Sequence, residues 1–241
     1  MSAFRILLAD DHPIFRLGLR SLLGAHEAWE VCGEAVDGRD AIEKCRKLKP
    51  DLLILDICLS RLNGVDAARR IVKDNPAQRI LVLTDVNSEQ VIRDCLEAGV
   101  RGWVFKSDGT DDLTTAVVAL QHNKSIFSSR VSDLIRDVYL QRHRVGPVAP
   151  TVPKLSPRER EVVQLLGEGK TSKETALVLN VALKTAETHR SNILRKLKLH
   201  SIAELVLYAV RNEIVHVHLP AMLRFPQPAN GRADVAAQGL N

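Results

Sequence analysis

The chain has 241 residues, of which 45% are hydrophobic and 26% charged, so it is long enough for two ordinary globular domains. No apolar run approaches the ~18 residues of a membrane span, and the N-terminus lacks the features of a signal peptide, so we expect a cytoplasmic protein with no membrane partner. Residues 1–140 carry 19 basic and 21 acidic side chains, whereas residues 141–217 carry 13 and 7. Any nucleic-acid contact is therefore expected in the second half of the chain.

The first ~120 residues alternate short apolar runs with segments of helical periodicity. The runs predict five strands, at Ile6–Ala9, Trp29–Ala35, Leu52–Leu55, Ile80–Thr84 and Gly102–Phe105. The segments predict five helices, at Ile14–Leu23, Ala41–Leu48, Val65–Val72, Glu89–Ala98 and Leu113–His122. This alternation is typical of a doubly wound, flavodoxin-like α/β domain with a five-stranded parallel sheet, in which ligands bind beyond the carboxyl ends of the strands. In the first helix a single stripe predicts core residues at Ile14, Leu17, Leu19, Leu22 and Leu23.

The alternation stops after residue 122, which we take as the end of the first domain, 1–122. Residues 123–153 are predicted to be a linker that contains one further helix near Leu134–Tyr139 and a Pro-rich segment at 143–153. A second domain of four short helices is expected at 154–217. The tail at 218–241 has little periodicity and is expected to be disordered.

The helix starts of the second domain are marked by capping residues. Ser156 and Glu159 form a capping box with a proline between them at the first helical position, and Thr171 and Glu174 form another. Ser201 opens the last helix in the same way. Between them lies a helical segment at Lys184–Leu197. These signals predict a compact all-α module.

Polar side chains stand at the carboxyl ends of four of the five predicted strands. Asp10 and Asp11 follow the first strand, Asp56 the third and Lys106 the fifth, while Thr84 closes the fourth. The carboxyl ends of parallel strands meet at one edge of the sheet, so these groups are expected to converge there. Three neighbouring carboxylates require a cation, most plausibly Mg²⁺, and a carboxylate beside Mg²⁺ can attack phosphorus to form an aspartyl phosphate. Lys106 and Thr84 would then contact the phosphoryl oxygens.

Residues 4–122 resemble the receiver domains of two-component systems. The resemblance is carried by the following segments: Leu8-Ala9-Asp10-Asp11-His12-Pro13, Leu53-Ile54-Leu55-Asp56-Ile57, Asn63-Gly64, Leu81-Val82-Leu83-Thr84 and Gly102-Trp103-Val104-Phe105-Lys106. It implies that a sensor histidine kinase phosphorylates Asp56. It also implies that Asp11, Asp56 and the main-chain carbonyl of Cys58 hold Mg²⁺ with help from Asp10, and that Trp103 is a switch aromatic that follows Thr84.

The chain departs from the usual receiver pattern in the loop after the phosphoacceptor and beside the switch threonine. Leu59-Ser60 replaces the usual Met-Pro, which predicts a less rigid loop. Asp85 replaces a small residue or Met and adds negative charge near the phosphate entry. Neither departure removes a group that the chemistry needs.

The segment at Lys173–Leu197 predicts a helix-turn-helix. Asn180 tolerates the left-handed conformation that ends the first helix, and the next helix begins within four residues. On the second helix, hydrogen-bonding and basic groups share one face, opposite Ala186, Ile193 and Leu197. That face holds Lys184, Glu187, Thr188, Ser191 and Arg195. Such a face suits the major groove of double-stranded DNA.

Residues 154–215 resemble the LuxR-type DNA-binding domain, on the strings Leu155–Val162 and Lys184–Leu197. Its combination with a receiver is the arrangement of the NarL/FixJ family of response regulators. The resemblance implies base contacts from Glu187, Thr188 and Ser191. It implies DNA-backbone contacts from five residues, Lys173, Thr185, His189, Arg190 and Lys196. The last helix would form a homodimer through Leu205, Val206 and Ala209, and RNA polymerase is a further candidate partner.

Two departures concern the second domain. Ala182 occupies a position where the family usually has a capping Ser, which weakens the start of the recognition helix by about 1 kcal/mol. Thr175 and Ala186 replace larger residues, so the core is expected to be under-filled.

The sequence thus predicts a phosphorylation-dependent transcriptional regulator that is not an enzyme. Three alternatives stay open at this point. An aspartyl-phosphate phosphatase is disfavoured because it needs a second acid where Cys58 stands. An atypical receiver that binds DNA without phosphate is compatible with Asp85 and Ser60. A helical module that binds only protein would show no salt-dependent binding to DNA.

Overall fold

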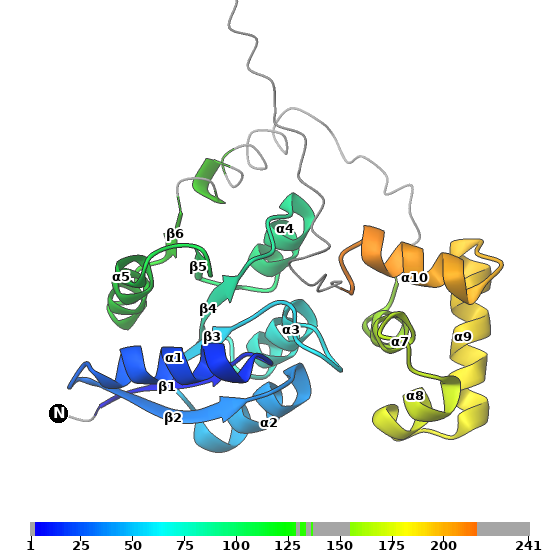
Figure 1. Cartoon of the computed structure of the whole chain (residues 1–241), viewed down its shortest axis with the longest axis horizontal. Helices are drawn as coiled ribbons and strands as arrows, with labels where there is room; N and C mark the ends of the chain where they lie inside the picture. The colour runs from blue at the N-terminus through cyan, green and yellow to red at the C-terminus, as the bar shows by residue number, and fades with distance from the viewer. Residues whose placement is uncertain (1–2, 129–130, 134–135, 137–154, 216–241) are drawn as a thin grey trace, which may run out of the picture.

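The computed structural model describes residues 3–128, 131–133, 136 and 155–215 (Figure 1). The predicted linker at 143–153, most of the predicted helix at Leu134–Tyr139 and the predicted tail at 218–241 lie outside these residues. Within the described part, no helix combines the length and the hydropathy that crossing a bilayer takes.

The first domain alternates strands and helices, as predicted. Its elements in chain order are β1 (Phe4–Ala9), α1 (Pro13–Gly24), β2 (Trp29–Ala35), α2 (Gly38–Leu48), β3 (Leu52–Leu55), α3 (Gly64–Asp74), β4 (Arg79–Thr84), α4 (Glu89–Glu97), β5 (Gly102–Phe105), α5 (Thr110–Gln121) and β6 (Ile126–Phe127). All strand pairs are parallel, in the order β2-β1-β3-β4-β5-β6. The doubly wound, flavodoxin-like α/β fold is therefore confirmed. The predicted count of five strands is wrong, because the two-residue strand β6 is too short to leave a periodic signal.

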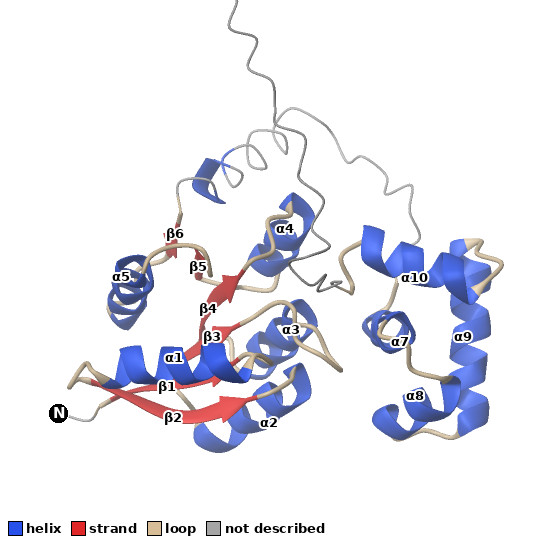
Figure 2. Cartoon of the chain, viewed as in Figure 1, coloured by secondary structure: helices blue, strands red, loops and turns tan. Residues whose placement is uncertain are grey.

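Helices cover both faces of the sheet, which is why β3 and most of β4 are continuously apolar (Figure 2). One core cluster packs α2, α3 and α4 against the sheet, and a second packs α1 and α5 against the opposite face. The predicted core stripe of α1 is correct at Leu19 and Leu23, which are buried. It is wrong at Ile14 and Leu17, whose side chains are 88% and 68% exposed.

The second domain contains α7 (Pro157–Gly167), α8 (Ser172–Leu179), α9 (Leu183–Leu197) and α10 (Ile202–Arg211), as the predicted four-helix module requires. The predicted capping boxes at Ser156 and Thr171 are both present, and the Ser201 side chain caps α10. A third hydrophobic cluster unites the four helices. Leu205 and Ala209 are fully buried in this cluster, so the prediction that they form a dimer surface is wrong. On α10, Ile202 and Leu207 are the large apolar side chains that remain exposed.

Candidate functional site

The predicted convergence of polar groups at the carboxyl edge of the sheet is present. Main-chain hydrogen bonds keep the strand ends in register: Asp56 N donates to Ala9 O at 2.8 Å, and Lys106 N donates to Thr84 O at 3.0 Å. Asp10, Asp56 and Thr84 are buried, with exposed fractions of 3%, 2% and 0%. The sheet therefore delivers two carboxylates, a hydroxyl and an amine to one place.

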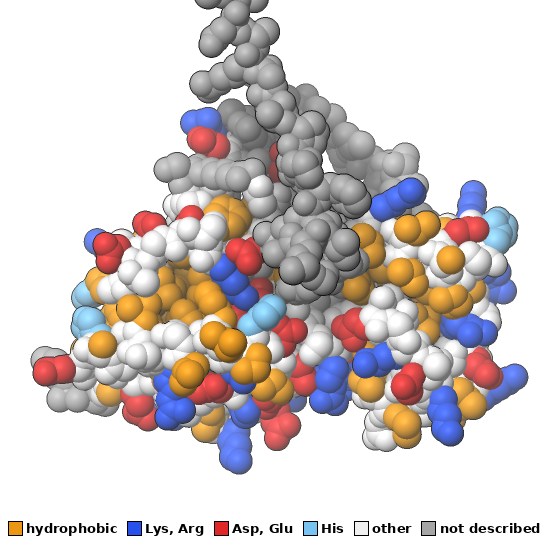
Figure 3. Space-filling model, in the orientation of Figure 1, with side chains coloured by type: hydrophobic (Ala, Val, Ile, Leu, Met, Phe, Trp, Pro, Cys, Tyr) orange, Lys and Arg blue, Asp and Glu red, His pale blue; other side chains and the backbone are white. Residues whose placement is uncertain are grey.

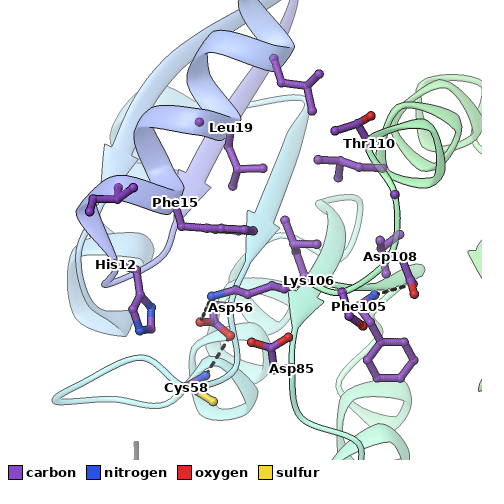
Figure 4. A pocket seen from close by; sticks show the side chains of 18 residues that line it. His12, Phe15, Leu19, Asp56, Cys58, Asp85, Phe105, Lys106, Asp108 and Thr110 are labelled. Carbon is purple, nitrogen blue, oxygen red and sulfur yellow. Dashed lines mark hydrogen bonds and ion pairs between the residues drawn. The ribbon is translucent and has the colours of Figure 1, made fainter. Parts of the chain in front are cut away.

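Lys106 links the two buried carboxylates. Its Nζ lies 2.7 Å from Asp10 Oδ2. It also lies 2.7 Å from Asp56 Oδ2 and 4.6 Å from the centre of the Phe15 ring (Figure 4). Burial alone would lower the pKa of Lys106, but the carboxylates of Asp56 and Asp10 outweigh it and raise the pKa above the ordinary lysine value. The amine is thus held as a cation beside Asp56.

The acidic group at this edge has the composition of a site for a hard divalent cation. Asp10, Asp11, His12 and Asp56 each offer a ligand atom, and these atoms lie within 4.8 Å of one another. Three of the four are carboxylates, which suit Mg²⁺. His12 was not predicted as a site residue; its Nδ1 lies 3.2 Å from Asp10 Oδ1 and 3.0 Å from Asp11 Oδ1. Its place directly after the Asp10-Asp11 pair was the available signal.

Main-chain amides donate to the side chains of Asp56 and Thr84 at this edge of the sheet. Cys58 N donates to Asp56 Oδ1 at 3.2 Å, and Val86 N donates to Thr84 Oγ1 at 3.3 Å. Burial, reinforced by the Asp56 carboxylate, raises the pKa of the Cys58 thiol to about 12. Thiolate chemistry at this position is therefore unfavourable near neutral pH, and Cys58 contributes to the site through its main chain.

Trp103, the predicted switch aromatic, is only 1% exposed and belongs to the core cluster beneath α2, α3 and α4. Its ring packs edge-on against Phe105 at a centroid distance of 6.1 Å. Within the described residues, its Nε1 is buried with no hydrogen-bond partner. A buried indole N–H of this kind costs about 1–3 kcal/mol, which disfavours the conformation seen here.

An open cavity of about 790 Å³ leads from the surface between α1 and α5 to Asp56 and Lys106 (Figure 4). Apolar side chains of both helices line it, including Phe15, Leu19 and Leu113, and Asp85 lies on its wall. Hydrophobic side chains gather on this face of the molecule (Figure 3). The cavity therefore connects Asp56 and Lys106 to solvent.

The helix-turn-helix of the second domain has the predicted geometry. Asn180 ends α8 with φ 51° and ψ 51°, and α9 begins at Leu183 after a three-residue turn. Ala182 provides no side-chain cap to α9, as expected from the sequence. Arg190 Nη1 donates to Ser172 Oγ at 3.3 Å and so ties the two helices together.

The polar face of α9 is largely open to solvent. Lys184, Thr185, Thr188 and Ser191 are exposed, Glu187, His189 and Arg190 are half-buried, and Ala186 and Ile193 lie in the core. The predicted backbone-contact residue Lys173 is exposed on α8. Lys196 is different, because its Nζ is 2.7 Å from Glu159 Oε2 and its side chain is 34% exposed. DNA would have to compete with that ion pair for Lys196.

A contact between the domains, not predicted from the sequence, is built on α7. Glu161 is fully buried and pairs with Arg39 of α2, with Arg70 of α3 at 3.3 Å and with Arg158 of its own helix at 2.9 Å. One helical turn away, Gln164 is 2% exposed and hydrogen-bonds to the loop between β3 and α3. In this docked arrangement α9 lies on the side of the second domain away from the receiver (Figure 1).

Arg160 continues the contact toward α4. Its guanidinium lies 3.7 Å from Asp66 Oδ2 on α3 and 3.5 Å from Asp94 Oδ2 on α4. Arg69 of α3 pairs with the same two aspartates, at 3.2 and 3.3 Å. The docked second domain is therefore connected to α4 as well as to the loop beside Asp56.

Comparisons with known proteins agree with this geometry. A family model described as "Response regulator receiver domain" matches residues 6–118, and one described as "Bacterial regulatory proteins, luxR family" matches residues 153–209. Response regulator protein VraR of Staphylococcus epidermidis is 32% identical over 213 residues, which are 88% of this chain and 99% of VraR.

Solved structures of RcsB are also similar. One, from Salmonella enterica serovar Typhimurium bound to promoter rprA in the presence of phosphomimetic BeF3-, is 28% identical with a TM-score of 0.55, covering 86% of this chain and 98% of RcsB. Another, of two RcsB dimers bound to two parallel DNAs, is 29% identical with a TM-score of 0.52 and the same coverage. This chain belongs to the NarL/FixJ family of two-component response regulators: it is a DNA-binding regulator with a receiver and a LuxR-type helix-turn-helix.

Proposed function

We propose that phosphorylation of Asp56 by a sensor histidine kinase controls DNA binding by the second domain. The observation that carries this proposal is the placement of a buried Asp56 carboxylate 2.7 Å from the Lys106 amine at the end of an open cavity. The carboxylate attacks the phosphorus of the kinase phosphohistidine, the P–N bond breaks, and the imidazole leaves. Lys106 neutralises charge that develops on the phosphoryl oxygens.

The carboxylates of Asp10, Asp11 and Asp56 and the carbonyl of Cys58 would hold Mg²⁺. When bound, Mg²⁺ supplies positive charge that offsets the repulsion between the carboxylates and the incoming phosphoryl group. Among the described residues, Lys106 bridges Asp10 and Asp56. The single positive charge of Lys106 therefore offsets only part of the negative charge of the three carboxylates.

Thr84 and Trp103 form the proposed switch. Thr84 moves its hydroxyl toward the phosphoryl oxygens and vacates space beside β5. Trp103 rotates into that space, and the move gives its buried Nε1 access to a hydrogen-bond acceptor. The switch thus changes the surface next to α4, to which Arg160 of the second domain is tied.

On the DNA, the base contacts are proposed for Glu187, Thr188 and Ser191. Lys173, Lys184, Thr185, His189, Arg190 and Lys196 are proposed to contact the DNA backbone. The chain would act in the cytoplasm as a homodimer on promoter DNA, with RNA polymerase as a further partner. The receiver would occupy residues 1–122 and the DNA-binding domain 154–217.

A regulator that binds DNA without phosphate is the second candidate. It is favoured by Asp85, an exposed acid on the wall of the cavity that leads to Asp56. A like charge at this entry opposes an anionic phosphodonor.

Phosphate incorporation and DNA binding separate the two candidates. The full chain is incubated with a small-molecule phosphodonor and Mg²⁺, alongside Asp56→Asn and, as a control at an exposed acid, Asp85→Asn. We expect loss of acid-labile phosphate incorporation only in Asp56→Asn, faster incorporation in Asp85→Asn, and tighter DNA binding after phosphorylation of the parent. Equal DNA affinity of the parent and Asp56→Asn under phosphorylating conditions would favour the phosphate-independent regulator.

A further inference from the structure

The loop at 57–63, which connects Asp56 to α3, is held at three main-chain points by the side chains of Gln164 in α7 and of Glu168, the C-cap residue of that helix. Gln164 Nε2 donates to Leu59 O at 3.0 Å, and Gln164 Oε1 accepts from Asn63 N at 2.8 Å. Glu168 Oε1 accepts from Arg61 N at 3.1 Å. The second domain therefore supplies hydrogen-bond partners to the main chain of Leu59, Arg61 and Asn63.

The amide of Gln164 is itself fixed in orientation. Its Nε2 also donates to Glu168 Oε1 at 2.7 Å, and its Oε1 also accepts from Asn63 Nδ2 at 3.2 Å. Both ends of the amide are thus used, and the side chain is 2% exposed. A buried amide with all these partners holds one geometry.

Buried side chains of Ile57, Leu59 and Leu62 anchor the loop in the receiver core, but no proline stiffens its main chain. Its sequence, Ile57-Cys58-Leu59-Ser60-Arg61-Leu62-Asn63, contains neither proline nor glycine. Arg61 has φ 63°, a left-handed conformation that a non-glycine residue adopts only at a cost. The contacts from α7 offset that cost in the docked chain.

A change in this loop reaches the phosphorylation site directly. At its far end Gly64 N donates to Ile57 O at 2.9 Å, and a Cβ at Gly64 would lie 2.2 Å from Asp56 O, so the loop closes tightly on the main chain of Asp56. Cys58, whose carbonyl is a proposed metal ligand, is next to Leu59, the first main-chain point that Gln164 holds.

We propose that Gln164, a residue of the DNA-binding domain, is a positioning residue for the Mg²⁺ site of the receiver. By holding the loop, it would keep the Cys58 carbonyl available as a ligand of Mg²⁺, in place of a rigid residue in the loop. The proposal rests on the proposed phosphorylation site. It implies that docking of the second domain and Mg²⁺ binding favour each other, because coupling between two binding equilibria is reciprocal.

The test is calorimetric titration of the full chain with Mg²⁺. Gln164→Ala is expected to weaken Mg²⁺ binding by about threefold or more, since a pre-ordered ligand is lost. Gln121→Ala is the matched control: it removes a glutamine that accepts from Trp29 Nε1, far from the loop. Its Mg²⁺ affinity is expected to equal that of the parent.

Rescue distinguishes positioning from a general loss of structure. Ser60→Pro restricts the loop backbone, and Ser60 N donates no hydrogen bond among the described residues. Added to Gln164→Ala, it is expected to restore most of the lost affinity. Hydrogen exchange at the Arg61 and Asn63 amides should accelerate in Gln164→Ala and not in Gln121→Ala.

Unchanged Mg²⁺ affinity in Gln164→Ala overturns the positioning role even if loop exchange accelerates. So does a loss of affinity that Ser60→Pro does not restore. A parent chain that binds no Mg²⁺ overturns the proposed metal site together with this role, whereas the first two outcomes leave the proposed function standing.

Discussion

Removal of the Glu161 charge should open the contact between the domains. In Glu161→Gln the buried carboxylate that accepts from Arg39, Arg70 and Arg158 becomes a neutral amide. Breaking a buried ion pair costs about 3–5 kcal/mol. The three arginine side chains are 30%, 36% and 37% exposed and can turn to water, so we place the loss at about 2–3 kcal/mol. The ratio of undocked to docked molecules should therefore rise roughly 30- to 140-fold.

The exchange rate of the Asn63 amide measures this population. Asn63 N donates to Gln164 across the contact and is released only when the domains separate, so its exchange rate is proportional to the undocked fraction. That fraction rises by the same factor as the ratio while the docked state predominates. Glu27→Gln, which removes an exposed carboxylate from the turn before β2, is the matched control and should leave the rate unchanged. A change of less than about threefold in Glu161→Gln would show that Glu161 does not hold the docked state.

Three further predictions follow from individual side chains. Thr175→Val should stabilise the second domain by about 1 kcal/mol in urea unfolding, because Thr175 Oγ1 is buried without a hydrogen-bond partner in the described chain. Thr171→Val, the same change at the cap of α8, should destabilise the domain by about 1 kcal/mol. If both substitutions changed the free energy of unfolding in the same direction, the reasoning would be refuted. Because the pKa of Cys58 is raised to about 12, its alkylation rate should still rise tenfold per pH unit between pH 8 and 10, whereas a plateau near pH 9 would contradict the burial argument. Lys173→Gln should reduce the number of salt ions released on DNA binding, measured from the slope of log affinity against log salt concentration, by about one. Lys196→Gln should reduce it by less, because Lys196 already pairs with Glu159 of α7. A larger reduction in Lys196→Gln than in Lys173→Gln would show that this ion pair breaks on DNA.

The receiver fold and its site were predictable because parallel strands leave a strong local signal. β3 is buried on both faces and is therefore apolar at every position, and the polar residue that follows such a strand must lie at the sheet edge. The convergence of Asp10, Asp56, Thr84 and Lys106 could be read from that rule alone. Caps such as Ser156 are equally local, since a helix start is set within four residues.

Features that depend on partners far along the chain were missed. Glu161 and Gln164 occupy polar positions of an amphipathic helix, which usually face solvent, and their receiver partners are about 90 to 120 residues away in sequence. The apolar positions of α10 posed the converse problem. Periodicity shows that Leu205 and Ala209 share a face, but not whether that face meets a second copy or α7.

Helix α7 belongs to two structures at once, and this limits how freely the halves of the protein can be exchanged. One side of α7 builds the hydrophobic core of the second domain. On the other side Glu161 pairs with Arg39 and Arg70 of the receiver, and Gln164, together with the C-cap residue Glu168, fits a particular receiver loop. A chimera that joins this DNA-binding domain to a foreign receiver would keep its fold and lose those partners. Transplanting residues 57–63 together with Arg39, Asp66, Arg70 and Asp94 would restore the match, so the modular unit of recombination is larger than either domain.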